Sequence, residues 1–177
     1  MTAAANPIAF DWRRVTDDDV FTLAALYRDA ALRLGPLVYT PEQSRAWASF
    51  VDDEPAFRHY VCDADTWIAE RPGDGRALGF CGVGTKGEVR EVHSLYVTPD
   101  CTRRGLGTEM LRRTLERAGA GGATRFAAWV TPFSRPVFLA AGFALTQTVE
   151  APFAGVMFER YRVERRRAGR GEAGLPI

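Results

Sequence analysis

The chain of 177 residues lacks the features of disulfide-stabilised, zinc-binding and membrane proteins. Its three cysteines, Cys62, Cys81 and Cys101, are odd in number and form no CxxC pair, which predicts neither a disulfide framework nor a metal site. No apolar run is long enough to span a bilayer, and the first residues lack the basic start and apolar core of a signal peptide. We therefore expect a cytoplasmic protein without a membrane segment or a bound metal.

An excess of charge of either sign is also missing. Lys+Arg number 23 and Asp+Glu 22, a net charge of +1, which argues against a dedicated nucleic-acid binder. A hydrophobic content of 46% over this length predicts one well-filled core, and the chain is too short to form two. We expect one domain over residues 1–163, followed by a disordered Arg-rich tail, residues 164–177, because the tail has no apolar periodicity.

Apolar periodicity and turn residues predict a mixed α/β fold. Strands are expected at residues 8–15, 66–70, 77–85, 89–97, 125–130, 143–149 and 156–163. Helices are expected at residues 16–34, 40–50, 105–118 and 134–141, each with a cap or stop signal at an end. The segment 52–60 is ambiguous and is compatible with a helical turn.

The most informative part of the sequence is the strand end at residues 93–99, which runs into Arg103-Arg104-Gly105-Leu106-Gly107-Thr108 and then into a helix. A helix N-terminus presents unpaired backbone N–H groups and the positive pole of the helix dipole, so it binds phosphate. Glycines let the backbone approach the anion, and two arginines add charge. The segment completes neither the Gly-x-Gly-x-x-Gly dinucleotide motif nor a Walker A loop.

Together with Phe138-Leu139-Ala140-Ala141-Gly142-Phe143, this pattern resembles the Gcn5-related N-acetyltransferase (GNAT) superfamily over nearly the whole chain. The family signature Gln/Arg-x-x-Gly-x-Gly/Ala falls on residues 102–107, with Thr102 at the first position instead of Gln or Arg. The resemblance implies a GNAT fold: a mixed, mostly antiparallel central sheet of six to seven strands flanked by about four helices. It also implies acetyl-CoA as the acyl donor.

In this family the loop and helix start hold the pyrophosphate of acetyl-CoA. The resemblance assigns that role to Thr102, Arg103, Arg104, Gly105, Leu106, Gly107 and Thr108. It assigns the pantetheine arm to the backbone of Leu95, Tyr96 and Val97, which would pair with it like an added strand. Phe138 stands where the family commonly has a tyrosine that protonates the departing thiolate. Phe138 is therefore expected to pack against cofactor or core, and the proton would come from water, Tyr96, Tyr39 or the substrate.

Glu91 and His93 are the candidate general bases. Strict alternation along the strand puts Glu91, His93 and Leu95 on one face, and Arg90, Val92 and Ser94 on the other. Glu91 aligns with the general-base glutamate of histone-type family members. His93 has an ordinary pKa of about 6.5, which suits base catalysis without tuning. A solvated strand charge for Glu91 and a structural role for His93 are the alternatives.

The acceptor pocket is less defined by sequence. The segment 37–47 resembles one in a bacterial subgroup of uncharacterised acetyltransferases, and its Tyr39 and Trp47 either line the pocket or pack the helix against the sheet. Phe133, Phe153 and Phe158 are candidates for the opposite wall. The resemblance implies an N-acetyltransferase acting on a small-molecule or peptide amine.

Three further points stay open at this level. The missing tyrosine at Phe138 makes a non-catalytic acyl-CoA-binding module the alternative function. A weaker alternative uses the tail arginines, Arg165 to Arg167, to contact nucleic acid or acidic partners. Dimers are common among relatives, so the resemblance also allows a homodimer.

Overall fold

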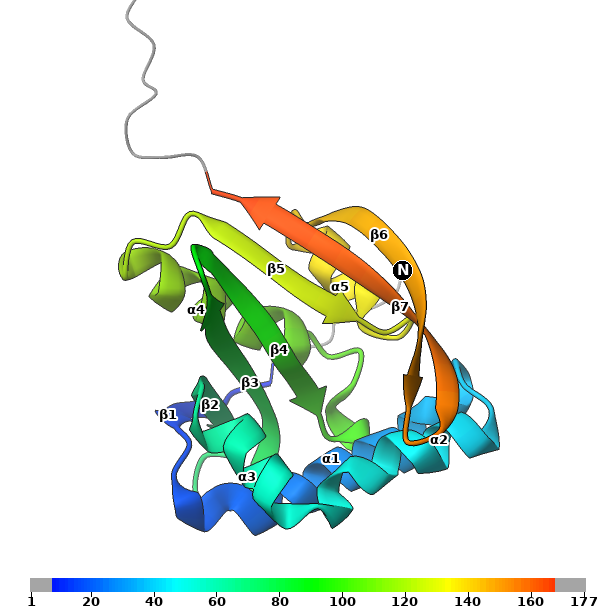
Figure 1. Cartoon of the computed structure of the whole chain (residues 1–177). Helices are drawn as coiled ribbons and strands as arrows, with labels where there is room; N and C mark the ends of the chain where they lie inside the picture. The colour runs from blue at the N-terminus through cyan, green and yellow to red at the C-terminus, as the bar shows by residue number, and fades with distance from the viewer. Residues whose placement is uncertain (1–7, 168–177) are drawn as a thin grey trace, which may run out of the picture.

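A twisted sheet of seven strands runs through the molecule in the computed structural model, which describes residues 8–167 (Figure 1). The strand order is β1-β2-β3-β4-β5-β7-β6. The strands are β1 (Asp11–Arg14), β2 (Asp65–Glu70), β3 (Ala77–Lys86), β4 (Val89–Val97), β5 (Arg125–Val130), β6 (Ala144–Phe153) and β7 (Val156–Arg166). All neighbours are antiparallel except β4 and β5. The mostly antiparallel sheet expected from the sequence is confirmed.

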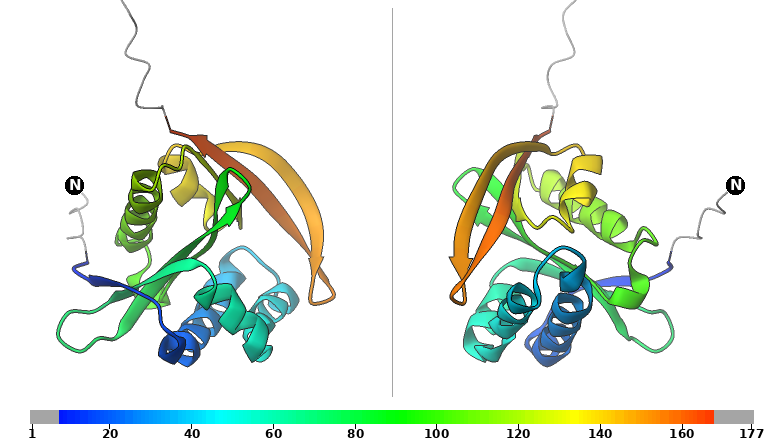
Figure 2. Two further views of the ribbon diagram at one scale, coloured as in Figure 1. Left: turned by 60° about the vertical axis from the view of Figure 1, so that its left-hand side comes forward. Right: turned by 90° about the vertical axis from the view of Figure 1, so that its right-hand side faces the viewer.

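Five α-helices cover the two faces of the sheet (Figure 2). α1 (Val20–Leu34), α2 (Pro41–Ala48) and α3 (Glu54–Cys62) lie on one face, and α4 (Leu106–Ala120) and α5 (Arg135–Ala140) on the other. The sequence predicted about four helices, and α3 is the addition. It forms because the Asp53 carboxylate accepts a hydrogen bond from the Ala56 N–H at 3.0 Å and Pro55 occupies the first turn.

Each face of the sheet buries its own hydrophobic cluster. Leu23, Phe57 and Phe80 are fully buried between the sheet and α1 and α3. Met110 and Leu111 of α4 are fully buried against the other face. Burial of large apolar side chains on both faces is what holds the strands in place, at roughly 25 cal/mol for each Å² removed from water.

The sheet extends beyond the expected end of the domain, residue 163. β7 continues to Arg166, which pairs with Arg125 of β5, and the Arg167 N–H donates to the Thr124 carbonyl at 2.8 Å. Backbone pairing needs no apolar side chain, so the charged sequence did not indicate it. The prediction of a disordered tail is therefore wrong for residues 164–167, and its remainder, residues 168–177, lies outside the described residues. Within the described part, no helix has the length and apolarity of a membrane span.

Candidate active site

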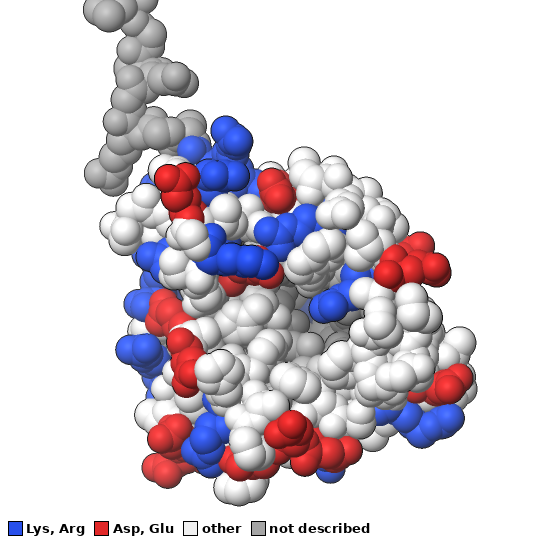
Figure 3. Space-filling model, viewed as in Figure 1, with Lys and Arg blue, Asp and Glu red and all other residues white. Residues whose placement is uncertain are grey.

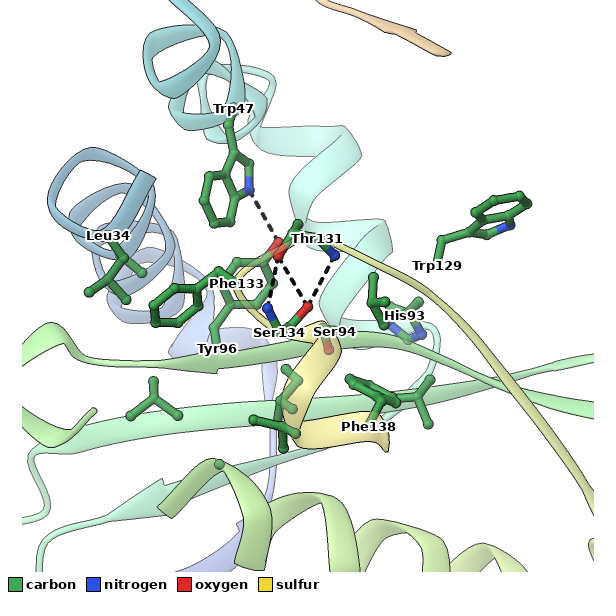
Figure 4. Close-up of a pocket in the computed structure, with 17 residues that line it drawn as sticks. Leu34, Trp47, His93, Ser94, Tyr96, Trp129, Thr131, Phe133, Ser134 and Phe138 are labelled. Atoms are coloured by element: carbon green, nitrogen blue, oxygen red, sulfur yellow. Dashed lines mark hydrogen bonds between the residues drawn. The ribbon is translucent and has the colours of Figure 1, made fainter. Parts of the chain in front are cut away.

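The site forms where β4 and β5 separate. Their parallel pairing is confined to Arg90 with Phe126 and Glu91 with Ala127, so the two strands diverge from Val92 onward. A cavity of about 110 Å³ occupies the gap and is lined by residues 92–97 of β4, the end of β5 and Gly107 at the start of α4 (Figure 4). The β4 edge that faces this gap has no partner strand among the described residues, so its N–H and C=O groups can pair with an extended ligand.

The loop before α4 has the backbone of an anion site. Arg103 has φ +59° and Gly105 has φ +79°, both in the left-handed region. No atom lies within 4 Å of a Cβ built on Gly105, so glycine is needed here for its conformation and not for space. Within the described residues, the backbone N–H groups of residues 103–108 have no hydrogen-bond acceptor. Such a row of free N–H groups at a helix start fits the pyrophosphate of a CoA molecule.

The side chains of this loop divide into anchors and free charges. Thr102 donates its hydroxyl to the Pro99 carbonyl at 2.8 Å and so closes the preceding turn. Leu106 is buried in the core, which leaves only its backbone for a ligand. Arg103 and Arg104 are exposed and form no ion pair with any residue that the structure describes. Their charge is therefore available to an anion.

Phe138 lies on α5 and lines the same gap. Its ring is 2% exposed and packs edge-on against Phe143, with 5.2 Å between ring centroids. The packing role expected for Phe138 fits this position. Thr131 and Ser134 also line this gap, and their hydroxyl groups bond to each other at 3.1 Å.

A β-bulge in β4 changes which residues share a face. Gly82 pairs with Ser94 and Val83 with Val92, so His93 is the extra residue. Beyond the bulge Leu95 turns toward the α4 core, whereas Tyr96 packs on the α1–α3 side. The alternation predicted from sequence is therefore wrong for Leu95: Glu91 and His93 share their face with Tyr96.

A second cavity of about 280 Å³ lies on this face and opens in the hollow seen in Figure 3. Tyr39 lines it from the loop before α2, Tyr27, Trp47, Phe50 and Tyr60 from helical segments, and Tyr96, Trp129, Phe153 and Phe158 from the strands. Tyr39 contacts Phe158 across the cavity, with ring centroids 5.2 Å apart. Tyr39, Trp47, Phe153 and Phe158 thus line the pocket expected for an acceptor, while Phe133 lines the other cavity.

The two cavities share a wall made by Trp47, His93, Tyr96 and the end of β5 at residues 129–131. A group in the β4–β5 gap and a group in the second cavity, which we call the aromatic pocket, therefore meet beside these side chains. This shared wall is where transfer between two bound molecules can occur.

Glu91 and Arg160 are the charged side chains of the aromatic pocket. Arg162 Nη1 lies 3.1 Å from Glu91 Oε2, and the two side chains are 16% and 20% exposed. The geometry is that of an ion pair and not of a hydrogen bond, so the buried Oε2 has no hydrogen-bond partner among the described residues. Arg162 also approaches Glu164 at 3.5 Å.

His93 is held by a reciprocal contact with α3. The Tyr60 hydroxyl donates to the His93 carbonyl at 2.6 Å, and His93 Nε2 lies 3.1 Å from the Tyr60 carbonyl. A carbonyl only accepts, so Nε2 carries the proton and Nδ1 is unprotonated in the neutral ring. Burial lowers the pKa of His93, although the Tyr60 carbonyl opposes this. The imidazole is therefore neutral at pH 7.

Tyr96 extends into the shared wall (Figure 4). The Trp47 indole N–H donates to its hydroxyl at 3.3 Å, and the Tyr27 ring lies 4.5 Å away between centroids. Burial raises the pKa of Tyr96, so its hydroxyl is protonated and can donate. Burial also raises the pKa of Tyr39 to about 12, but Tyr39 lines only the aromatic pocket.

Sequence reasoning missed Tyr60, Trp129, Arg160 and Arg162. Tyr60 lies on the helix that the sequence left ambiguous. The two arginines could have been found from the sequence, because Phe158, Arg160 and Arg162 alternate along β7 and so share one face of that strand. Among the described residues, no group of three or more His, Cys, Asp or Glu side chains could hold a metal ion.

The family comparison agrees with this geometry. Residues 25–143 match the model of the Acetyltransferase (GNAT) family, and the chain belongs to this family. The fold is shared as well. A GCN5-related N-acetyltransferase structure from Rhodopseudomonas palustris superposes with a TM-score of 0.81 at 25% identity, covering 94% of this chain and 99% of the other.

Other relatives are more distant or match only in part. An uncharacterized N-acetyltransferase of Methanocaldococcus jannaschii is 27% identical over 67% of this chain, which spans 52% of that protein. The mycothiol acetyltransferase of Clavibacter michiganensis is 35% identical over 46% of this chain and 26% of its own length. The PaiA N-acetyltransferase of Thermoplasma acidophilum, solved in complex with coenzyme A, has the same fold, with a TM-score of 0.75 at 15% identity over 90% of this chain and 100% of that one. The aligned part of this chain thus spans about half or less of the two matched sequences.

Proposed function

We propose that this protein transfers the acetyl group of acetyl-CoA to the amine of a small molecule or a peptide. The observation that carries the proposal is the shared wall: the β4–β5 gap, which suits the donor, meets the aromatic pocket, which suits the acceptor, beside His93 and Tyr96. Direct attack of the amine on the thioester then needs no covalent intermediate on the protein.

In this proposal the loop at residues 103–108 binds the pyrophosphate through its free N–H groups. The open edge of β4 at Leu95, Tyr96 and Val97 pairs with the pantetheine arm. An N–H group of that edge also stabilises the negative charge that develops on the thioester oxygen. These contacts come from the backbone, so they do not require Gln or Arg at the position of Thr102.

The acceptor amine must lose a proton, because an alkyl ammonium has a pKa of about 10.4 and is not a nucleophile. We assign this proton to Glu91, directly or through one water, because its Oε2 is buried at the pocket without a hydrogen-bond partner in the described part of the chain. The amine nitrogen bonds to the acetyl carbon, the C–S bond breaks, and Tyr96 gives its proton to the thiolate. The nitrogen loses its second proton as the amide forms, this proton returns Tyr96 to the neutral phenol through water, and Glu91 releases its proton to solvent. His93 has a positioning role: its contacts with Tyr60 hold the β4 bulge in place.

The test is a steady-state assay of free CoA release with a panel of amines. Release that depends on an amine, together with the acetylated amine detected by mass spectrometry, is the expected result. The competing function is a non-catalytic acyl-CoA-binding module, which Phe138 favours because it lacks the hydroxyl of a proton donor. A rise in melting temperature with CoA and no turnover of any amine would support that module instead.

A further inference from the structure

The charge of the aromatic pocket is not balanced. Glu91 is paired with Arg162, whereas Arg160 has no carboxylate within ion-pair distance among the described residues. The neighbouring acid on β7, Glu159, points to the other face of the strand and bonds to the Tyr161 hydroxyl. This exposed arginine at the lining of the open pocket is therefore free to bind an anionic group of the ligand.

From this we infer that the acceptor is an amino acid with a free carboxylate and an aromatic or large apolar side chain. The inference rests on the proposed acetyl transfer. A guanidinium binds a carboxylate through two parallel hydrogen bonds, which fixes the orientation of the ligand as well as adding affinity. With the carboxylate at Arg160, the adjacent amine can turn toward Glu91 and the shared wall.

The remaining surface of the pocket fits the side chain of such a ligand. Rings from the helices face Phe153 and Phe158 of the β6–β7 hairpin, so the walls are apolar with aromatic faces and edges. The cavity of about 280 Å³ lies at the small end of ligand pockets, which suits one amino acid.

Two other acceptor classes fit less well. A polyamine would bring several positive charges to a pocket whose carboxylate, Glu91, is already paired and whose free charge, Arg160, is positive. A peptide N-terminus has no carboxylate next to its amine and would leave Arg160 without a partner. Both remain outcomes of the test below.

The experiment compares kcat/KM for L-phenylalanine, L-phenylalaninamide and phenethylamine, with spermidine as the polyamine. We expect L-phenylalanine to exceed its amide and phenethylamine by about tenfold or more, the usual scale of a hydrogen bond to a charged group. The amide has the lower amine pKa, so a larger fraction of its amine is unprotonated at neutral pH, and a preference for L-phenylalanine would therefore come from the pocket.

Arg160→Gln should reduce the ratio of kcat/KM for L-phenylalanine to that for phenethylamine by about tenfold, and Arg160→Lys should reduce it less because it keeps the charge. Arg166→Gln is the matched control, because it removes an exposed arginine from the same strand outside the pocket, and its ratio should equal that of the wild type. The comparison works as a double-mutant cycle between the arginine and the carboxylate.

An equal or higher kcat/KM for the amide, phenethylamine or spermidine, with the same ratio in Arg160→Gln, would overturn the inference and leave acetyl transfer standing. If no amine turns over, the proposed function fails and the pocket is tested by calorimetry on the CoA complex. Tighter binding of L-phenylalanine than of phenethylamine, lost in Arg160→Gln, then upholds the inference. Equal binding rejects it.

Discussion

The donor side and the acceptor side of the proposed site are built in different ways. The donor side uses backbone groups from one continuous stretch, residues 92–108, which contains an open strand edge and a helix start. The acceptor side uses side chains from residues 27–60, from β4 and β5, and from the β6–β7 hairpin, which lie far apart in the sequence. Backbone recognition tolerates changes of side chain, and side-chain recognition does not. This difference explains how one fold can keep its donor and change its acceptor.

The largest effect is expected on the acceptor side. Glu91→Gln keeps the size of the side chain and a contact to Arg162 but cannot take a proton, so kcat should fall about 100-fold or more. The Kd of CoA should stay the same, because Glu91 does not line the donor gap. Stopped-time assays for kcat and calorimetry for Kd measure the two quantities separately.

Glu164→Gln is the matched control for this change, since Glu164 is the other carboxylate near Arg162 and does not line the pocket. It should keep most of the wild-type rate. If Glu91→Gln retains full kcat across the pH range, Glu91 is not the general base, and the acceptor side does not supply the proton acceptor.

The second prediction concerns CoA binding on the donor side. Gly105→Val places a β-branched residue at φ +79°, so the loop must move and the free N–H groups lose their alignment. The Kd of CoA, measured by calorimetry, should rise tenfold or more. Gly87→Val provides the control: Gly87 also has a positive φ, +60°, and a Cβ added there would meet no atom within 4 Å, but it lies in the turn between β3 and β4.

Both glycine variants should lose conformational stability, by about 1–2 kcal/mol from the left-handed backbone, and only Gly105→Val should lose CoA affinity. An unchanged Kd in Gly105→Val would remove the phosphate-binding assignment of this loop. A similar rise of Kd in both variants would show that the loss comes from general destabilisation.

The third prediction distinguishes the roles of the Tyr96 and Tyr39 hydroxyl groups. Tyr96→Phe should lower kcat about tenfold, because it removes the protonated hydroxyl at the wall shared by both cavities. Tyr39→Phe should act mainly on the KM of the acceptor, since Tyr39 lines the aromatic pocket alone. The reverse pattern, a loss of kcat confined to Tyr39→Phe, would move the proton donor to the acceptor side.

The same contrast explains what could be predicted from the sequence. The loop at residues 103–108 is short and continuous, and its glycines, arginines and following helix are local signals, so its position could be inferred from the sequence alone. The seven strands also follow from local periodicity. His93 and Leu95 show the limit of that inference. Strict alternation placed them on one face, and a single bulged residue separates them because β3 pairs Gly82 with Ser94 and Val83 with Val92.

The acceptor side could not be predicted to the same degree. Arg162 meets Glu91 because β5 lies between their strands and because the register sets Trp129 opposite Arg162 and Ala127 beside Glu91. That register depends on long-range pairing, which no local pattern encodes. Tyr60 was hidden for another reason: the segment 52–60 has no long apolar stripe, and its helix is specified by the cap at Asp53.

The smallest predicted effect concerns His93, where the two sides meet. Burial lowers the pKa of His93 in the folded protein, so the unfolded chain binds a proton on this ring more readily. The free energy of unfolding should therefore fall as pH drops below about 6.5, the ordinary histidine pKa. His93→Gln keeps an N–H donor for the Tyr60 carbonyl and should show a shallower decline between pH 6.5 and 5. His59 is present in both proteins, so the comparison isolates His93. Carboxylates such as Asp19, with a pKa of about 2, lose their contribution only at lower pH. Urea unfolding at several pH values measures the difference. Equal slopes would contradict a buried neutral ring, and a parallel loss of kcat in this range, absent from His93→Gln, would make His93 the base instead of Glu91.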